Sequence, residues 1–199
     1  GDIMYDAVLR NISIAKAKYQ NHAWVKEIAD ENQINLSISD KKYYLATVHR
    51  AENTDSPDKL KTIFKAFNSL DKPVILPLHP RTKNIINNMG ISLNNIILIK
   101  PVGYLLMLYL TANAHMVITD SGGLQKEAYF LKTPCTTLRD QTEWVETLIK
   151  NWNILTPIDY NQIINAVSRK FDLNTPQLNA FGEGNAASKI CEAIIRSKT

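Results

Sequence analysis

Residues 116–127 read Met-Val-Ile-Thr-Asp-Ser-Gly-Gly-Leu-Gln-Lys-Glu, a short apolar strand that runs into the start of a helix. Two consecutive glycines allow the backbone to approach a ligand closely. The unpaired N–H groups and the dipole at a helix start together favour phosphate. Glu127 follows within the first two turns, and its carboxylate can accept hydrogen bonds from both hydroxyls of a ribose. The segment therefore indicates a site for a nucleoside diphosphate.

The same residues also fit an ordinary strand-to-helix turn in which Asp120 or Ser121 caps the helix. The segment alone does not separate these two interpretations, because strand-to-helix turns with such caps are common. The rest of the chain is needed to choose between them.

The composition places the chain among ordinary globular proteins. Its 199 residues are 45% hydrophobic and 21% charged, which fits one large domain or two small ones. No apolar run approaches the roughly 20 residues that span a bilayer, and no secretory signal is present, so we expect a cytoplasmic protein without a membrane partner. The net charge of +4 mildly favours an anionic ligand, but no basic cluster is dense enough to indicate nucleic acid. Cys135 and Cys191 lie in apolar periodic stretches and are expected to be buried free thiols.

Strands and helices alternate along the chain. Apolar strands are predicted at 43–48, 74–78, 95–99, 116–119, 135–138 and 153–155. Helices are predicted at 3–19, 22–31, 57–70, 82–88, 104–113, 124–131, 142–149, 159–170 and 185–197. Strands that are apolar on both faces and alternate with helices predict an α/β fold, a doubly wound parallel sheet of the Rossmann-like type.

In such a fold, ligands bind beyond the carboxyl ends of the strands. The loops at these ends contain His49-Arg50-Ala51-Glu52-Asn53, His79-Pro80-Arg81, Pro101-Val102-Gly103-Tyr104 and Asp120-Ser121-Gly122-Gly123. His49 alone would fit packing or capping, but its polar neighbours favour a ligand role; His79 fits turn packing and ligand contact equally. Arg139 to Trp144 could orient a ligand, although capping of a helix near Thr142 is simpler. No metal-ligand spacing is present, and no G-x-S-x-G elbow supports a nucleophilic Ser121.

Taken together, these motifs resemble the non-hydrolysing UDP-N-acetylglucosamine 2-epimerases. The resemblance is carried by His49-Arg50-Ala51-Glu52-Asn53, His79-Pro80, Thr119-Asp120-Ser121-Gly122-Gly123-Leu124-Gln125-Lys126-Glu127-Ala128, Arg139-Asp140-x-Thr142-Glu143 and Phe181-Gly182-Glu183-Gly184-x-Ala186-Ala187. It covers the whole chain but only about the second half of such an enzyme. The family has two Rossmann-like domains in a GT-B arrangement with the active site between them. The resemblance therefore implies that residues 1–199 are the C-terminal, UDP-binding domain, and that the N-terminal domain with the acidic residues acting at C2 is a missing partner.

The resemblance also implies a mechanism and the residues that serve it. UDP-GlcNAc and UDP-ManNAc interconvert when C2 is deprotonated, UDP leaves by anti elimination, and UDP adds back. The UDP-binding residues would be Met107 for uracil, Ser121, Gly122 and Gly123 for the diphosphate, and Glu127 for the ribose. His49 would be the catalytic residue that stabilises or protonates the leaving group. Arg50 and His79 are candidate contacts of a UDP-sugar activator. No metal or other cofactor is needed, and a homodimeric parent is expected.

Two departures from the family pattern leave the sugar open. Val102 stands where many members have a polar residue that meets the base, and Trp144-Val145-Glu146 replaces the more usual Arg-Pro-Glu. The second form also resembles epimerases of UDP-2,3-diacetamido-2,3-dideoxyglucuronic acid. A GT-B glycosyltransferase donor domain and a non-catalytic nucleotide-binding module are the alternatives from other classes. We expect the isolated chain not to epimerise.

Overall fold

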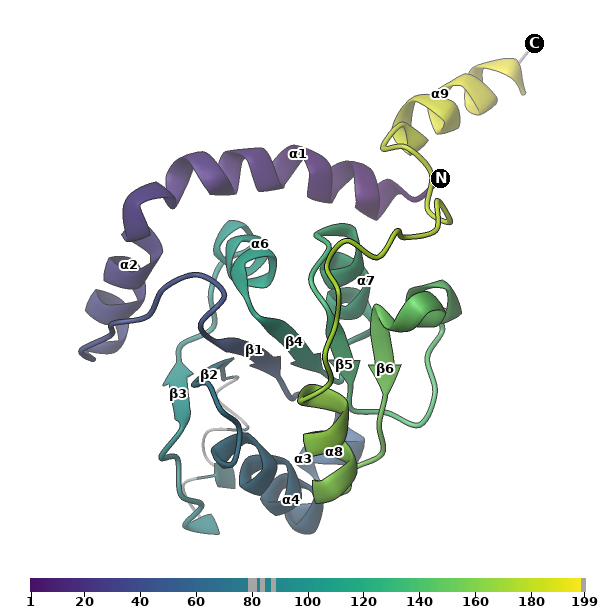
Figure 1. The fold of residues 1–199 in the computed structure, drawn as a ribbon. Coiled ribbons are helices and arrows are strands. Elements are labelled where there is room, and N and C mark those ends of the chain that lie inside the picture. The colour runs from purple at the N-terminus through teal and green to yellow at the C-terminus, as the bar shows by residue number, and fades with distance from the viewer. Residues whose placement is uncertain (79–81, 83–84, 87–88, 198–199) are drawn as a thin grey trace.

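The computed structural model of the chain describes residues 1–78, 82, 85–86 and 89–197. Its centre is a six-stranded parallel sheet in the order β3-β2-β1-β4-β5-β6 (Figure 1). The strands are β1 Tyr44–Thr47, β2 Val74–Pro77, β3 Ile96–Ile99, β4 Met116–Thr119, β5 Cys135–Thr137 and β6 Asn153–Leu155. The predicted α/β, doubly wound, Rossmann-like sheet is therefore confirmed.

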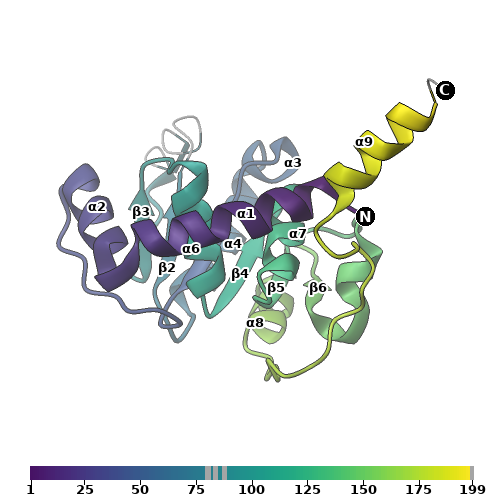
Figure 2. The same ribbon diagram turned by 90° about the horizontal axis from the view of Figure 1, so that it is seen from above.

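Helices cover both faces of this sheet (Figures 1 and 2). On one face lie α1 Ile3–Lys18, α2 Ala23–Asn32, α6 Tyr104–Asn113 and α7 Gly122–Phe130. On the other lie α4 Pro57–Asn68 and α8 Tyr160–Val167, with the single turn α3 Ala51–Thr54 beside them. Successive strand residues point to opposite faces, so Leu45 and Val117 join one core while Ala46 and Ile118 join the other. All four side chains are fully buried, which explains why the strands read as continuous apolar runs.

Local sequence signals account for several helix boundaries. The side chain of Asp2 caps α1 by accepting from the N–H of Met4 at 2.8 Å. Ser56 caps α4 in the same way, and Pro57 occupies its first position, where a missing N–H costs nothing. Asp159 caps α8. These caps explain why the predicted helix starts agree closely with the observed ones.

Three details of the sequence prediction need correction or restriction. The helix predicted at 142–149 is instead an irregular 3-10 segment, η2 Val145–Asn151, interrupted at Ile149 and Lys150. The hydroxyl of Thr142 binds the side chain of Gln125 at 2.6 Å, so tertiary contacts hold this stretch away from a regular helix. Cys135 is buried as predicted, but Cys191 is exposed. The helix predicted at 82–88 falls largely outside the described residues.

The chain's C-terminal segment returns across α7 toward the first residues. Residues 177–181 run along Tyr129, whose hydroxyl donates to the carbonyl of Leu178 at 3.2 Å and accepts from its N–H at 3.0 Å. We call residues 177–185 the strap. At its end Gly182 has φ +84°, and a β-carbon there would lie 2.9 Å from Cα of Gly1. The glycine is therefore required both by its left-handed backbone and by the close approach of the first residue.

The last helix, α9 Ala186–Arg196, extends away from the body of the molecule (Figures 1 and 2). Its start is tied to α1, because the carboxylate of Asp6 accepts from the N–H groups of Ala186 at 3.1 Å and Ala187 at 2.8 Å. The apolar residues Ile190, Ile194 and Ile195 are exposed. Cys191 lies on this helix, which explains its exposure: the amphipathic pattern that predicted burial has no partner surface among the described residues.

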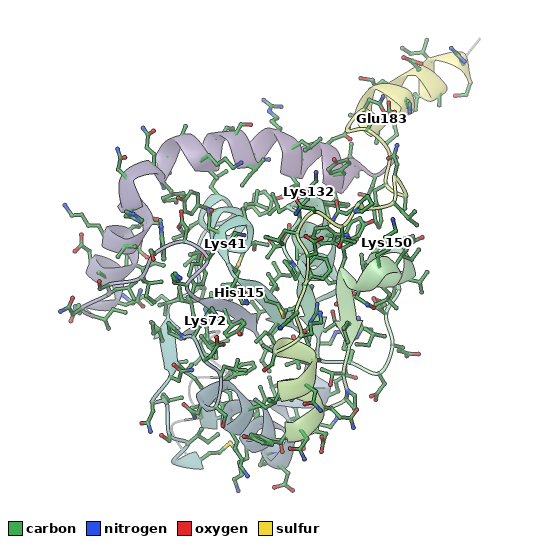
Figure 3. All side chains as sticks on the ribbon, in the orientation of Figure 1. Lys41, Lys72, His115, Lys132, Lys150 and Glu183 are labelled. Carbon is green, nitrogen blue, oxygen red and sulfur yellow. The ribbon has the colours of Figure 1, made fainter. Side chains whose placement is uncertain are left out.

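The amino ends of the central strands carry basic residues. Lys41, Lys72 and His115 precede β1, β2 and β4 and lie close to this end of the sheet (Figure 3). Burial, together with nearby Lys72, lowers the pKa of His115. Within the described part of the chain, no helix combines the length and apolar character needed to cross a membrane.

Candidate functional site

The strand order reverses direction between β1 and β4, so the loops after these two strands open side by side. The strands pair in register, with Thr47 opposite Thr119. Their hydroxyl oxygens lie 2.6 Å apart, and the Thr119 hydroxyl also accepts from the N–H of Ser121 at 2.9 Å. The sheet therefore brings the His49 loop and the Ser121 turn together at its switch point.

Residues 121–123 form a turn with unused donors, which we call the glycine turn. Ser121 is the N-cap of α7, and its hydroxyl accepts from the N–H of Leu124 at 3.3 Å. The N–H groups of Gly122 and Gly123 precede this position, and the first N–H groups of a helix have no acceptor within it. In the ranges that the structure describes, no other group accepts from them. They are therefore free to donate to a further acceptor.

The space around the two glycines supports this interpretation. A β-carbon on Gly122 would meet nothing closer than 3.5 Å, and one on Gly123 nothing closer than 3.8 Å. Packing inside the chain therefore tolerates alanine at both positions. The chain's own packing therefore does not require glycine at either position, and the space beside both backbones is open to a ligand.

The carboxylate of Asp120 connects the loop that follows β4 to the His49 loop that follows β1. The side chain of Asp120 is fully buried. One carboxylate oxygen accepts from the N–H of Arg50 at 3.0 Å and from the side-chain amide of Asn53 at 3.0 Å. The N–H of His49 donates to both oxygens, at 3.2 and 3.1 Å. A buried carboxylate needs such partners, and these fix the path of the His49 loop.

The same carboxylate also orients the His49 ring. Nδ1 of His49 lies 3.3 Å from Oδ1 of Asp120. About half of the histidine side chain (52%) is exposed, so the ring reaches out of the loop while its Nδ1 side is held. A carboxylate in this position fixes the orientation of the ring and leaves Nε2 to face outward. Of the two residues that the sequence offered as helix caps, Ser121 is the cap, and Asp120 instead holds the His49 loop.

A small apolar cavity adjoins His49. Its volume is about 210 Å³, and it is lined by Thr47, Val48, His49, Pro77, Pro101, Val102 and Met107. The structure thus brings His49 and Met107 together, although they are 58 positions apart in sequence. The apolar lining suits the flat face of a heterocyclic base, with His49 at one side.

Glu127 is buried and carries a perturbed carboxyl group. Burial raises its pKa to about 7, while a hydrogen bond from the Tyr104 hydroxyl acts in the opposite direction. Tyr104 is the first residue of α6, and Met107 follows one turn later on the same helix. The start of α6 therefore links the candidate ribose residue to the cavity at Met107.

A second, more polar cavity lies on the other side of the His49 loop. Its volume is about 400 Å³, and Arg50, Glu52, Asn53, Lys59, Leu138, Arg139, Asp140, Gln141, Pro157 and Ile158 line it. Arg139 donates to both oxygens of Glu143, at 3.0 and 2.9 Å, and this pairing lowers the pKa of Glu143 to about 2. Arg50 lies in this cavity and not beside Met107. His79, the other candidate activator contact, lies outside the described residues.

Comparison with known proteins identifies the family of the chain. A family model described as UDP-N-acetylglucosamine 2-epimerase matches residues 1–195. The chain belongs to this family. It is 46% identical, over 98% of its length, to a Methanococcus maripaludis protein named UDP-N-acetylglucosamine 2-epimerase homolog. Over 77% of its length it is 43% identical to the UDP-2,3-diacetamido-2,3-dideoxy-D-glucuronate 2-epimerase of Pseudomonas aeruginosa.

A solved structure of this epimerase family shares the fold. The UDP-GlcNAc 2-epimerase of Methanocaldococcus jannaschii superposes with a TM-score of 0.82 at 35% identity, covering 98% of this chain. A second structure of the M. jannaschii enzyme, in complex with UDP-GlcNAc and UDP, gives a TM-score of 0.81. The chain spans about half the length of these relatives: 53% of the M. maripaludis protein and 55% of the solved chain.

Proposed function

We propose that this chain is the UDP-binding half of a UDP-N-acetylglucosamine 2-epimerase, with residues 1–199 as its C-terminal Rossmann-like domain. One observation carries the proposal: the glycine turn, with two unused N–H donors, lies at the switch point beside a histidine held by a buried carboxylate. Family membership and the ligands named for the M. jannaschii structure, UDP-GlcNAc and UDP, support it.

The residues divide the nucleotide between them. The diphosphate would take the N–H groups of Gly122 and Gly123 and the hydroxyl of Ser121, at the positive end of the α7 dipole. Glu127, once ionised, would accept from the two ribose hydroxyls. The uracil would occupy the cavity at Met107 and bind its backbone. The link from Glu127 through Tyr104 to α6 supports placing ribose and base side by side.

The proposed reaction eliminates and re-adds UDP. A base takes the C2 proton, the C1–O bond breaks with its electron pair leaving on UDP, and 2-acetamidoglucal remains. Charge then develops on the diphosphate oxygen, where the unused N–H groups and an imidazolium at His49 stabilise it. Re-addition of UDP to C1, with protonation of C2 from the opposite face, gives the epimer. Asp120 would hold the His49 ring in place for this step through its contact with Nδ1.

The base at C2 is proposed to come from a second domain. The carboxylate that borders Gly122 is that of Glu143, whose Oε2 would lie 3.7 Å from a β-carbon built there, and it is engaged by both guanidinium N–H₂ groups of Arg139. We therefore propose a parent enzyme with two Rossmann-like domains in a GT-B arrangement, homodimeric and cytoplasmic, with the active site between the domains. The isolated chain is expected to bind UDP weakly and not to epimerise.

A specific observation keeps one alternative substrate in view. Trp144 stands where Arg is more usual in the family, and a relative 43% identical is named as an epimerase of UDP-2,3-diacetamido-2,3-dideoxy-D-glucuronate. Both substrates carry UDP, so they share every contact proposed above. The two substrates differ only in the sugar, whose binding site the proposed N-terminal domain would complete.

Calorimetry with UDP and with uridine tests the binding half of the proposal. UDP should bind more tightly than uridine, because only UDP reaches the glycine turn. Equal affinities would remove the diphosphate from that turn. Catalysis is tested by joining the chain to the N-terminal half of an epimerase relative and supplying each UDP-sugar in deuterated water. Deuterium should enter at C2; transfer of sugar to an acceptor alcohol would contradict the proposal and favour a glycosyltransferase.

A further inference from the structure

Trp144 lies at the glycine turn, although the proposed mechanism gives it no role. A β-carbon built on Gly122 would lie 3.5 Å from Nε1 of Trp144 and 3.7 Å from Oε2 of Glu143, so the indole nitrogen and a carboxylate that is paired with Arg139 both border the space that the glycine leaves open. Within the described ranges, this N–H has no acceptor of its own. The indole is only partly buried, whereas Trp24 and Trp152 are almost completely buried. Its donor is therefore available beside the unused N–H groups of the turn.

A buried cation lies against the same ring. Nζ of Lys126 is 3.8 Å from the centre of the Trp144 indole. Lys126 is only 5% exposed and forms an ion pair with Asp2. Its charge is thus held behind the indole and cannot reach a ligand at the turn directly. A cation over an aromatic face draws electron density toward itself, which makes the indole N–H a stronger donor.

Hydrogen bonds fix the indole relative to α7. The backbone N–H of Trp144 donates to the hydroxyl of Thr142 at 3.1 Å, and the backbone carbonyl of Trp144 accepts from the hydroxyl of Thr147 at 2.7 Å. Thr142 in turn donates to Gln125, one residue before Lys126, at 2.6 Å. The segment that carries Trp144 is therefore attached to the helix whose first residues form the turn. Such support keeps a binding residue in place before the ligand arrives.

We infer that Trp144 is a further binding residue of the diphosphate site: its Nε1–H donates to a phosphate oxygen held by Gly122, with Lys126 polarising the ring from behind. The inference rests on the proposed function, because it takes the ligand to be a nucleoside diphosphate. It gives Trp144 a role beyond packing, as an uncharged donor backed by the buried cation of Lys126.

The test compares Trp144→Phe with Trp152→Phe in the chain itself. Phenylalanine keeps an aromatic ring at position 144 but removes the N–H. Trp152 is a matched control, because its Nε1 is buried without a partner and its replacement removes no hydrogen bond. Calorimetry uses three ligands: UDP, uridine and inorganic pyrophosphate. Trp144→Phe should weaken UDP and pyrophosphate roughly tenfold, as expected for a hydrogen bond to a charged group, and leave uridine unchanged. Trp152→Phe should change none of the three.

Fluorescence gives a second readout that does not depend on a stability change. The chain has three tryptophans, and Trp144 is the one beside the turn. Pyrophosphate should alter the emission of the wild-type chain and of Trp152→Phe, but not that of Trp144→Phe. Equal weakening of UDP and uridine by Trp144→Phe, or no weakening of pyrophosphate, would overturn the inference. Trp144-dependent pyrophosphate binding without uridine binding would support it while contradicting the proposed nucleoside contacts, and a chain that binds none of the three ligands would contradict both.

Discussion

The two ends of the sheet use polar groups in opposite ways. At the amino end, the chain satisfies its own groups: Nζ of Lys41 donates to the carbonyls of Ala112 and Ala114, and the hydroxyl of Tyr43 donates to Leu110 at 2.8 Å. At the carboxyl end, Gly122 and Gly123 keep unused N–H groups. A polar end that closes on itself stabilises the fold, whereas one that leaves donors open is prepared for a ligand.

The two ends also differ in their carboxylates. Asp71 at the amino end is 67% exposed and pairs with Tyr44 and Lys72 near the surface. Asp120 at the carboxyl end is completely buried. The same residue type thus belongs to a surface pair in one place and supports a candidate catalytic histidine in the other. Four measurements follow from this contrast, the first with the largest expected effect.

Replacing each aspartate by asparagine should separate the two ends most clearly. Asp120→Asn removes a buried charge and turns an amide N–H₂ toward groups that are themselves donors, so we expect a loss of about 3–5 kcal/mol of unfolding free energy. Asp71→Asn should cost less than about 1 kcal/mol, because its pairs lie near solvent. Urea denaturation of both variants measures the difference. Similar losses would mean that the buried cluster around Asp120 has no special structural role.

Glu127→Gln should increase stability at high pH. The pKa of Glu127 is raised from about 4.5 to about 7, so the folded state holds a proton that the unfolded state releases between these values. Wild-type stability therefore falls as pH rises through this window, by up to about 3 kcal/mol, and glutamine avoids the loss. Urea denaturation at pH 4 and pH 8 checks this: the variants should match at pH 4 and diverge at pH 8. A constant difference would show that burial does not perturb this carboxyl group.

The same carboxyl group should make nucleoside binding depend on pH. Glu127 must lose its proton to accept from two ribose hydroxyls, so with a pKa of about 7 uridine affinity should fall about fivefold between pH 7 and pH 6, equivalent to about 1 kcal/mol. Uridine is the better probe here, because it has no phosphate that titrates nearby. Calorimetry should find this slope in the wild-type chain and none in Glu127→Gln. A pH-independent wild type would remove Glu127 from the ribose role.

Lys126→Met should have the smallest effect on binding. It removes the cation behind Trp144 while keeping much of the side-chain volume, so UDP should weaken by about 0.5–1 kcal/mol. Uridine affinity should stay the same, since uridine does not reach the glycine turn. Calorimetry with both ligands makes the comparison, and Lys126→Arg, which retains a cation, should recover part of the loss. Unchanged UDP affinity in Lys126→Met would place the lysine in a purely structural role.

Much of the fold was predictable because its signals are local. The strand at 116–119 and the helix at 104–113 agree with β4 and α6 to the residue, since apolar runs and clear boundaries define both. The role of Asp120 was not predictable in this way. Its partners lie about 70 positions earlier, and only the pairing of β1 with β4 brings them together. The sequence does hold one signal for this role. Asp120 directly follows the predicted apolar strand 116–119, and His49 directly follows the predicted strand 43–48.

The misjudged elements also depend on distant contacts. The pattern at 142–149 fits a helix, but Thr142 and Thr147 bind groups in α7 and β6, which a single stretch of sequence does not reveal. Cys191 has the periodicity of a buried position, yet α9 extends away from the sheet. Periodicity reports that a face can be buried, and it does not report which surface covers that face.

The attachment of the strap has a mechanical consequence. The N–H of Asp2 bonds to the carbonyl of Phe181 at 2.9 Å, and Asp6 holds the start of α9, so the first and last segments of the body meet at one point. A pulling force applied between residue 1 and residue 186 would load these bonds first, and then those between the strap and Tyr129, before it reaches the six strands. Optical-trap extension between those positions should therefore release the strap at low force, long before the sheet ruptures. The point where the first and last segments meet lies next to Lys126, which forms an ion pair with Asp2 and packs against the indole of Trp144 beside the glycine turn.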